Sequence, residues 1–282
     1  MYEIVNKQIL GPNLTQYEIK ALRIAKTRKC GQFVMVRPTQ FSERIPLTVA
    51  HTNPQIGTIT LIVQTVGKTT LQMSQMAIGE GFLDVAGPMG RPSHIDNFGT
   101  VVVIGGGLGT AVVYPQAIAL KELGNQIISI IGARTKNLLI LKEQLAAVSD
   151  RLILTTDDGS AGKKGLVTDA LRELIDDPDT DIGAVYCAGP VIMMKAVSAA
   201  TRPAGIPTFV SLNPIMVDGT GMCGGCRVTI DGQTRFACVD GPEFDGHKVN
   251  YDELMDRLTT YRRYEKNSLQ QYEKNHKCNL RG

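Results

Sequence analysis

Short runs of alternating apolar and polar residues occupy the first third of the chain. Gly and Pro separate these runs, which span residues 17–23, 32–37, 44–51, 58–66 and 82–86. Alternation with a period of two is typical of strands in an antiparallel barrel or sandwich. A single helical pattern, residues 70–76, follows Gly67. The sequence therefore predicts an antiparallel β-barrel domain over residues 1–98.

The pattern changes near residue 99 to continuous Val- and Ile-rich runs separated by helical periodicity. The apolar runs span residues 100–105, 126–132, 151–155, 184–187 and 207–212. Helical patterns cover residues 111–123, 138–148, 167–174 and 191–201. Buried strands that alternate with helices of this length are typical of a parallel sheet. We therefore expect a parallel α/β domain over residues 99–215.

The last part of the chain holds a cysteine-rich segment, residues 216–250, and then a helix and tail, residues 251–282. Leu254, Met255, Leu258 and Tyr261 recur at helical spacing, which predicts a helix with one apolar face. That face packs either on this chain's own domains, the reading we favour, or on a partner subunit. The polar and basic residues from Arg262 onward are expected to form a solvated or frayed end rather than a binding arm.

Composition narrows the possible functions. The chain has 282 residues, of which 43% are hydrophobic, and 30 basic residues against 27 acidic ones give a net charge of +3. This balance offers no electrostatic case for binding nucleic acid or an anionic membrane. We see no signal peptide in the first ten residues and no apolar run long enough to span a bilayer, so we expect a cytoplasmic protein. Three scattered cysteines, Cys30, Cys187 and Cys278, give no disulfide framework.

The clearest chemical pattern is Asp218-x4-Cys223-x2-Cys226-x11-Cys238. A plant-type [2Fe–2S] site has the spacing Cys-x4-Cys-x2-Cys followed by a distant fourth Cys, and here Asp218 replaces the first Cys. Three thiolates and one carboxylate can hold two irons, which indicates an electron carrier. Two alternatives stay open: Asp218 is an ordinary turn residue beside an incomplete site, or the four residues hold a structural zinc ion.

A second pattern indicates nucleotide binding. The strand Val101–Ile104 runs directly into the glycine-rich turn Gly105–Gly109, and a helix is expected from Thr110. Such a turn leaves backbone N–H groups and the positive helix end free to face a phosphate. The motif departs from G-x-G-x-x-G because Thr110 replaces the third Gly. Tight packing without a ligand remains the alternative.

Residues at the carboxyl ends of the neighbouring strands have two readings each. Arg134 pairs with a 2′-phosphate or is a surface charge, the reading we favour. Asp157 and Asp158 bind an unphosphorylated ribose or form a turn. Cys187, in Cys187-Ala188-Gly189-Pro190, contacts a nicotinamide or is a small buried residue.

Two segments of the predicted barrel have the chemistry of a pyrophosphate site. Arg44-Ile45-Pro46-Leu47-Thr48 places a guanidinium group and a hydroxyl on one strand, and Gly67-Lys68-Thr69-Thr70 offers a turn at a helix start. An Arg fork binds pyrophosphate oxygens bidentately, and free amides at a helix N-terminus complete the site. Each segment alone is weak evidence for a pyrophosphate site. Both precede a nucleotide-type domain in the chain, and this order strengthens the prediction for each.

Together these motifs resemble the ferredoxin-NADP+ reductase superfamily. The segments that carry the resemblance are Arg-x-Pro-Leu-Thr, Gly-x-Thr-Thr, Gly87-Pro88-Met89-Gly90, the glycine-rich turn and Cys-Ala-Gly-Pro. The cysteine loop narrows it to the branch that resembles the electron-transfer subunit of dihydroorotate dehydrogenase B. The Asp-first loop, with residues 211–217 before it and 236–249 behind it, is most similar to the small subunits of NADH-dependent ferredoxin:NADP+ oxidoreductases, also called sulfide dehydrogenases.

The resemblance implies three cofactors and their residues. FAD would bind Arg44, Pro46, Leu47, Thr48, Gly67, Thr69 and Thr70, with Ile62, Val63 and Gln64 lining it. NAD(H) would bind Gly106, Gly107, Gly109 and Thr110, with Cys187, Ala188 and Gly189 near the nicotinamide and Asp157 near a ribose. A [2Fe–2S] cluster would bind Asp218, Cys223, Cys226 and Cys238. No side chain is expected to act as a catalytic acid or base, because the cofactors carry the reaction.

The function implied is electron transfer between NAD(H), FAD and the cluster in a heterodimer that performs flavin-based electron bifurcation. The partner would be a larger flavin and [4Fe–4S] subunit that binds NADP(H) and reduces ferredoxin. The first alternative is the electron-transfer subunit of a dihydroorotate dehydrogenase B complex, against which Asp218 counts. A nucleotide-binding module with structural zinc is the remote alternative.

Overall fold

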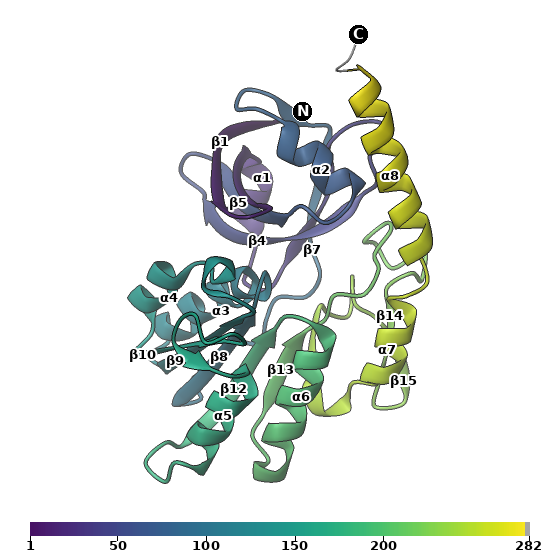
Figure 1. Ribbon diagram of the computed structural model, residues 1–282. Coiled ribbons are helices and arrows are strands. Elements are labelled where there is room, and N and C mark those ends of the chain that lie inside the picture. Colours follow the sequence, from purple (N-terminus) through teal and green to yellow (C-terminus); the bar gives the residue numbers. More distant parts are fainter. Residues whose placement is uncertain (280–282) are drawn as a thin grey trace.

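The computed structural model describes residues 1–279, with side chains as far as residue 274. A barrel lies above a parallel sheet, and the cysteine-rich segment and two final helices flank both (Figure 1). Within residues 1–279 no helix is long and apolar enough to cross a membrane.

Seven antiparallel strands form the barrel, in the order β6-β1-β2-β5-β4-β3-β7. They are β1 (Tyr2–Gly11), β2 (Leu14–Lys20), β3 (Phe33–Arg37), β4 (Ile45–Asn53), β5 (Thr58–Gln64), β6 (Gly81–Phe82) and β7 (Asp84–Met89). Helices α1 (Leu22–Thr27) and α2 (Lys68–Gln75) accompany them. The predicted barrel is confirmed, and its interior is filled by buried side chains such as Tyr17, Leu61 and Met73.

Two elements of the barrel differ from the sequence prediction. β1 was not predicted, because its alternation is irregular and Ile9 lies exposed on it. The predicted strand over residues 17–23 ends early, since helix α1 begins at Leu22. α1 has only six residues, of which Ile24 and Ala25 are buried, so it is too short to show helical periodicity.

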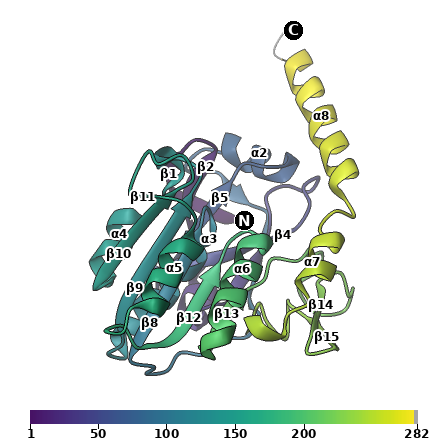
Figure 2. The ribbon, with the colours of Figure 1, turned by 60° about the horizontal axis from the view of Figure 1, so that its bottom comes forward.

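The second sheet has the order β11-β10-β9-β8-β12-β13-β16. Its parallel strands are β8 (Thr100–Gly106), β9 (Gln126–Ala133), β10 (Arg151–Thr156), β11 (Lys163–Lys164), β12 (Ile182–Ala188) and β13 (Thr208–Ser211). Helices α3 (Gly109–Glu122) and α4 (Lys142–Val148) cover one face, and α5 (Val167–Asp176) and α6 (Val191–Thr201) cover the other (Figure 2). The predicted parallel α/β architecture is confirmed.

The cysteine-rich segment is joined to both sheets. It contains the hairpin β14 (Arg227–Ile230) and β15 (Gln233–Phe236), and then β16 (Glu243–Asp245). β16 pairs antiparallel with β13, so it extends the parallel sheet at its edge. Phe33 and Met35 of the barrel also form one buried apolar cluster with Cys226, Ala237 and Cys238.

Two helices end the described chain. α7 (Tyr251–Arg257) buries Tyr251 and Leu254 against the core beneath α6, which agrees with docking on this chain's own domains. α8 (Arg262–Asn279) runs past α2, where the Tyr272 hydroxyl donates to Gln75 Oε1 at 2.9 Å. These residues are therefore helical rather than frayed, and most side chains from Arg262 to Lys274 are exposed, as expected for a solvated end. They contain no Gly or Pro and are rich in Glu, Lys, Gln and Arg, which favour helix without an apolar face. Residues 280–282 of the expected tail lie outside the described residues.

Candidate cofactor sites

Asp218 and Cys223 lie together at the exposed start of the cysteine loop. Asp218 Oδ1 accepts from the Thr220 N–H at 2.9 Å, and Oδ2 accepts from the Cys223 N–H at 3.0 Å. The Thr220 N–H, followed by the Cys223 contacts, lowers the pKa of the Asp218 carboxyl. Asp218 is thus held as a carboxylate whose other lone pairs remain free to bind a cation.

Cys226 and Cys238 form a second, buried pair. Their Sγ atoms lie 3.1 Å apart, too far for a disulfide, and the Cys238 N–H donates to Cys226 Sγ at 3.4 Å. Burial, followed by the nearby Cys226, raises the pKa of the Cys238 thiol to about 12. Two thiolates this close require a bound cation to ionise together, and a coordinating metal deprotonates a thiol outright.

These two pairs fit a two-iron cluster better than a single ion. Among the described residues, no three His, Cys, Asp or Glu side chains converge to hold one metal ion. A [2Fe–2S] cluster takes two protein ligands on each iron. Asp218 with Cys223 and Cys226 with Cys238 would supply this arrangement.

The cysteine loop packs directly on the barrel. Gly219 has φ +80°, and a Cβ there would lie 2.6 Å from both Met35 and Met89. Glycine is required here by both the backbone conformation and the close approach. Met35 is on β3, which pairs with β4, the strand that begins directly after Arg44 and carries Pro46, Leu47 and Thr48. The ligand loop and the expected flavin strand are therefore separated by one strand.

The start of α2 is a candidate site for a pyrophosphate. Thr70 Oγ1 accepts from the Gly67 N–H at 3.0 Å and from the Val66 N–H at 2.9 Å. The buried Thr69 hydroxyl accepts from the Glu43 N–H at 3.2 Å. Thr69 and Thr70 thus fix the turn, while the helix start presents its positive end.

Arg44 is held by an acid that the sequence analysis did not identify. Its Nη2 lies 3.7 Å from Asp84 Oδ2, and Arg37 Nη2 binds the same oxygen at 2.5 Å. Nothing in the local sequence signals this contact, because Asp84 is on β7 and reaches Arg44 only through the barrel fold.

The three β5 residues expected to line FAD face different surroundings. Val63 is buried in the barrel interior, and Ile62 packs in a cluster with Ala111 of α3. Gln64 is exposed at the strand end. Ile62 and α3 therefore bring the barrel and the nucleotide-type domain into contact beside the expected flavin strand.

The glycine-rich turn lies against the turn that follows β12. A Cβ on Gly109 would lie 2.0 Å from the Ala188 carbonyl oxygen, and one on Gly106 would lie 2.4 Å from Met193 Sδ. Gly107 adopts φ +54°. Thr110 is buried at the start of α3, and its hydroxyl has no hydrogen-bond partner. The structure thus brings Gly106, Gly107, Gly109 and Thr110 to Ala188 and Gly189.

The Cys187 thiol points away from this edge into the hydrophobic core. It is 1% exposed, among residues that include Val102 and Val210, and burial raises the pKa of the thiol. The backbone of residues 187–190, rather than the thiol, therefore faces the turn.

Arg134, Asp157 and Asp158 meet at the ends of β9 and β10. Asp158 accepts from the Ser160 N–H and hydroxyl at 2.9 and 2.6 Å, as a turn residue does. The Asp158 N–H donates to the Arg134 carbonyl at 3.3 Å. Asp157 is exposed at the same carboxyl edge of the sheet, where doubly wound folds bind nucleotides.

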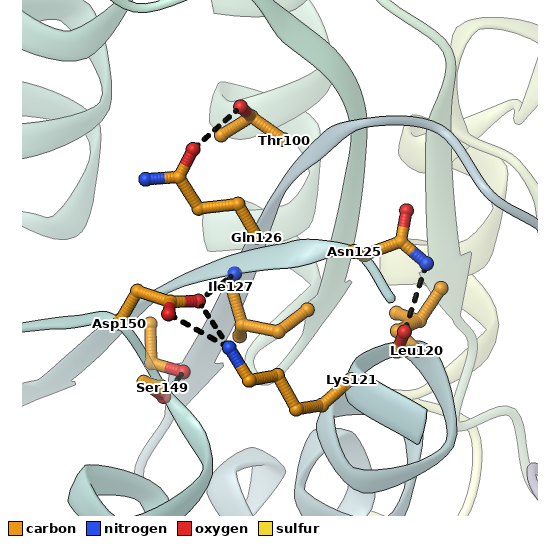
Figure 3. Close-up of polar contacts among 9 residues, drawn as sticks. Thr100, Leu120, Lys121, Asn125, Gln126, Ile127, Ser149 and Asp150 are labelled. Atoms are coloured by element: carbon orange, nitrogen blue, oxygen red, sulfur yellow. Dashed lines mark hydrogen bonds and ion pairs between the residues drawn. The ribbon is translucent and has the colours of Figure 1, made fainter. Parts of the chain in front are cut away.

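The opposite edge of this sheet is occupied by structural contacts (Figure 3). Lys121 Nζ binds Asp150 at 2.7 Å, and Asp150 Oδ2 accepts from the Ile127 N–H at 2.8 Å. Asn125 Nδ2 donates to the Leu120 carbonyl at 2.8 Å and so closes the end of α3. These contacts fix the end of α3 against the strands. They lie at the edge of the sheet opposite the carboxyl ends, where the candidate nucleotide-binding residues are found.

Comparison with known proteins agrees with this organisation. Residues 103–199 match the oxidoreductase NAD-binding domain, and residues 213–250 match the iron–sulfur cluster binding domain of dihydroorotate dehydrogenase B. A Thermotoga maritima protein described as a dihydroorotate dehydrogenase B (NAD(+)) electron transfer subunit homolog is 50% identical, over 96% of this chain and 95% of its own length. The Desulforamulus reducens electron transfer subunit is 32% identical over 86% of this chain and 95% of its own length.

A solved structure of an NADH-dependent reduced ferredoxin-NADP oxidoreductase, described in connection with flavin-based electron bifurcation, is also similar. It shares 48% identity and a TM-score of 0.90, over 96% of this chain and 98% of the other. The fold is that of the ferredoxin reductases, and the cofactors are FAD, NAD(H) and an iron–sulfur cluster. The chain belongs to the family of dihydroorotate dehydrogenase B electron-transfer subunits and their homologues, which are oxidoreductase subunits.

Proposed function

We propose that this chain is the small subunit of an NADH-dependent ferredoxin:NADP+ oxidoreductase. The observation that carries the proposal is the 48% identity to the oxidoreductase structure along nearly the whole of both chains. Asp218 in the first ligand position supports it. The cytoplasmic location expected from the sequence stays a prediction.

The residues of the chain would hold the cofactors in a series. The Gly106–Thr110 turn would bind the NAD(H) phosphates, with Ala188 and Gly189 beside the nicotinamide and Asp157 near a ribose. Arg44, Thr48 and the start of α2 would bind FAD, which exchanges two electrons with a nicotinamide and one with an iron–sulfur cluster. Asp218, Cys223, Cys226 and Cys238 would hold the cluster across β3 from the flavin strand.

Exposed apolar side chains around the cluster loop are suited to a partner subunit. Met222 is 89% exposed and Val217 is 55% exposed, and both adjoin ligand residues. A hollow of about 250 Å³ opens beside Cys223 and is lined by Arg227 and Arg257. Exposed apolar groups of this kind commonly mark interfaces. The partner would be a larger subunit with flavin and [4Fe–4S] centres that binds NADP(H) and reduces ferredoxin.

The test is anaerobic purification from the native cell through a tag on this chain. We expect co-purification of a larger flavin and [4Fe–4S] subunit, and NADPH-dependent reduction of NAD+ that requires oxidised ferredoxin. Two NADPH give four electrons, of which two reduce NAD+ to NADH and two reduce ferredoxin. The isolated chain should contain FAD, two irons and two acid-labile sulfides. A colourless chain with one zinc ion would contradict the proposal.

A second candidate is the electron-transfer subunit of a dihydroorotate dehydrogenase B complex, favoured by the described function of the Desulforamulus reducens relative. The same purification separates the two. A pyrimidine dehydrogenase partner, with dihydroorotate-dependent NAD+ reduction, would support this candidate instead.

A further inference from the structure

A partly buried carboxylate lies where three parts of the molecule meet. Glu243 is the first residue of β16, the strand that follows Cys238 along the chain. Its Oε2 accepts from Ser93 Oγ at 3.0 Å and from Gln116 Nε2 at 2.5 Å, and its Oε1 accepts from the His94 N–H at 3.3 Å. Ser93 and His94 belong to the segment that leaves the barrel, and Gln116 belongs to α3. Glu243 therefore connects the cluster segment to the barrel exit and to the nucleotide-type domain.

No cation compensates this carboxylate. Among the described residues, no Lys, Arg or His forms an ion pair with Glu243. Arg91, next along the barrel exit, pairs instead with Asp240 at 3.6 Å. Burial raises the pKa of the Glu243 carboxyl to about 7, against the lowering effect of Ser93 and His94.

Other titratable side chains around Glu243 belong to Cys30, Tyr186 and His94. Cys30 lies beneath Ser93, where burial raises the pKa of its thiol to about 11. Tyr186 of β12 donates to the His94 carbonyl, and burial raises the pKa of its hydroxyl as well. The His94 ring packs against Phe98 and Phe209. Cys30 and Tyr186 are therefore uncharged near pH 7 and place no further charge beside Glu243.

The side-chain amide of Gln116 can form a hydrogen bond with Glu243 in either charge state of the carboxyl. Gln116 is 1% exposed, and its Oε1 has no hydrogen-bond partner although its Nε2 donates to Glu243. A buried acceptor without a donor is unfavourable. Rotation of the amide by half a turn would bring Oε1 to the carboxyl, where it accepts from a protonated Glu243. The same side chains thus offer a hydrogen bond to both the ionised and the protonated acid.

β16 connects this acid to the cluster ligands. Adjacent side chains on a strand point to opposite faces, so Phe244 points away from Glu243. Phe244 packs in the apolar cluster that contains Cys226 and Cys238. The strand is fixed at its start, since the Pro242 carbonyl accepts from the Leu212 N–H at 2.9 Å. Negative charge that arrives on the cluster would face Glu243 across one strand of apolar protein, where charges are weakly screened.

We propose that Glu243 is a proton-uptake site of electron transfer: when one electron reaches the iron–sulfur cluster, one proton from solvent binds the Glu243 carboxylate. The electron would come from NADH through the flavin, the bond formed would be the O–H of Glu243, and the proton would return to solvent when the cluster is oxidised. The proposal rests on the cofactor content given under the proposed function. Added negative charge favours the protonated form of a nearby acid, which is the physical basis of the coupling.

The test is a redox titration of the cluster in the purified chain with its cofactors, followed by electron paramagnetic resonance between pH 6 and 8.5. In the wild type, the reduction potential should fall as pH rises, by a fraction of the 59 mV per pH unit expected for one proton per electron. Glu243→Gln should remove most of this slope, because its amide copies the protonated acid and Gln116 can pair with it. Asp256→Asn removes an exposed acid from α7 and should keep the wild-type slope.

A second measurement needs no variant. The reduced-minus-oxidised infrared spectrum of the wild type should gain the carbonyl band of a protonated carboxyl, and Glu243→Gln should lack it. An equal pH slope in the wild type and Glu243→Gln, or no carboxyl band on reduction, would overturn the proton-uptake proposal alone. Absence of the cluster signal from the wild type would overturn this proposal and the proposed function together.

Discussion

At the scale of single residues, Asp218 combines two roles that a cysteine could not. Both of its oxygens accept backbone N–H groups of the loop, at 2.9 and 3.0 Å, and each retains lone pairs for a metal. Hydrogen bonds to a ligand orient it and tune the metal. Asp218 therefore shapes the loop, and as the proposed first ligand it would also complete the ligand set. The two roles can be separated by substitution.

We expect Asp218→Cys to retain the cluster with a shifted reduction potential, because a thiolate replaces a carboxylate on one iron. Asp218→Asn keeps one oxygen that can accept a hydrogen bond but loses the negative charge. Cluster retention should therefore fall by roughly 10–100-fold, the loss of metal affinity that is typical when a residue that hydrogen-bonds a metal ligand is mutated. Visible spectra, iron content and potentiometry measure both outcomes. An Asp218→Ala protein with an unchanged spectrum and potential would show that Asp218 is not a ligand.

Glu243 also predicts a pH dependence of stability. The folded-state pKa is about 7, above the usual value of 4.5, so the folded protein binds the proton more tightly than the unfolded chain. The stabilisation is complete below pH 4.5 and is lost as pH rises through 7, with an upper size of roughly 3 kcal/mol. Denaturant midpoints should therefore show Glu243→Gln close to the wild type at pH 5 and more stable at pH 8.5. If Asp256→Asn showed the same gain in stability over the wild type between pH 5 and pH 8.5, Glu243 would not be the cause of the pH dependence.

At the scale of elements, the strength of a local pattern decided what the sequence could predict. The Val- and Ile-rich strands β8, β9 and β12 lie within two residues of their expected bounds, because their runs are continuous and buried. β1 and α1 were missed, since the first is irregular and the second is shorter than two helical turns. The contacts Asp84–Arg44 and Glu243–Gln116 could not be found, because they join residues that only the tertiary structure brings together.

Helix α2 carries a prediction at this scale. Thr70→Val removes the hydroxyl that accepts the Gly67 and Val66 N–H groups, so the helix start should lose about 1 kcal/mol. If this turn binds FAD, affinity of the apoprotein for FAD should fall by about fivefold, as such an energy implies. Thr70→Ser retains the hydroxyl and should bind FAD like the wild type. Fluorescence titration with free FAD measures both affinities. If Thr70→Val and Thr70→Ser bind FAD equally well, FAD does not bind at this turn.

At the scale of the whole molecule, the cluster-binding segment is the part that unites the chain. It extends the parallel sheet through β16, packs on the barrel through Phe33 and Met35, and rests on α7 through Arg257, which donates to the Gly225 carbonyl at 3.0 Å. The core of the parallel sheet, by contrast, is formed mainly by its own strands and helices, and the cysteine-rich segment adds Val228 and Phe244 on one face. Loss of the cluster should therefore loosen the segment and its seat on the barrel while the parallel sheet stays folded.

Hydrogen–deuterium exchange can test this organisation. Cys226→Ser breaks the buried thiol pair and should abolish the cluster, because one iron then lacks a thiolate ligand. We expect faster exchange over residues 215–240 and in β3, which share the apolar cluster of Phe33, Met35 and Cys238, and unchanged protection in β8, β9 and β12. Cys30→Ser, a thiol outside the ligand set, should leave the exchange of residues 215–240 unchanged. Faster exchange throughout the parallel sheet in Cys226→Ser would instead mean that the cluster stabilises the whole molecule, and that the two sheets do not fold as separate units.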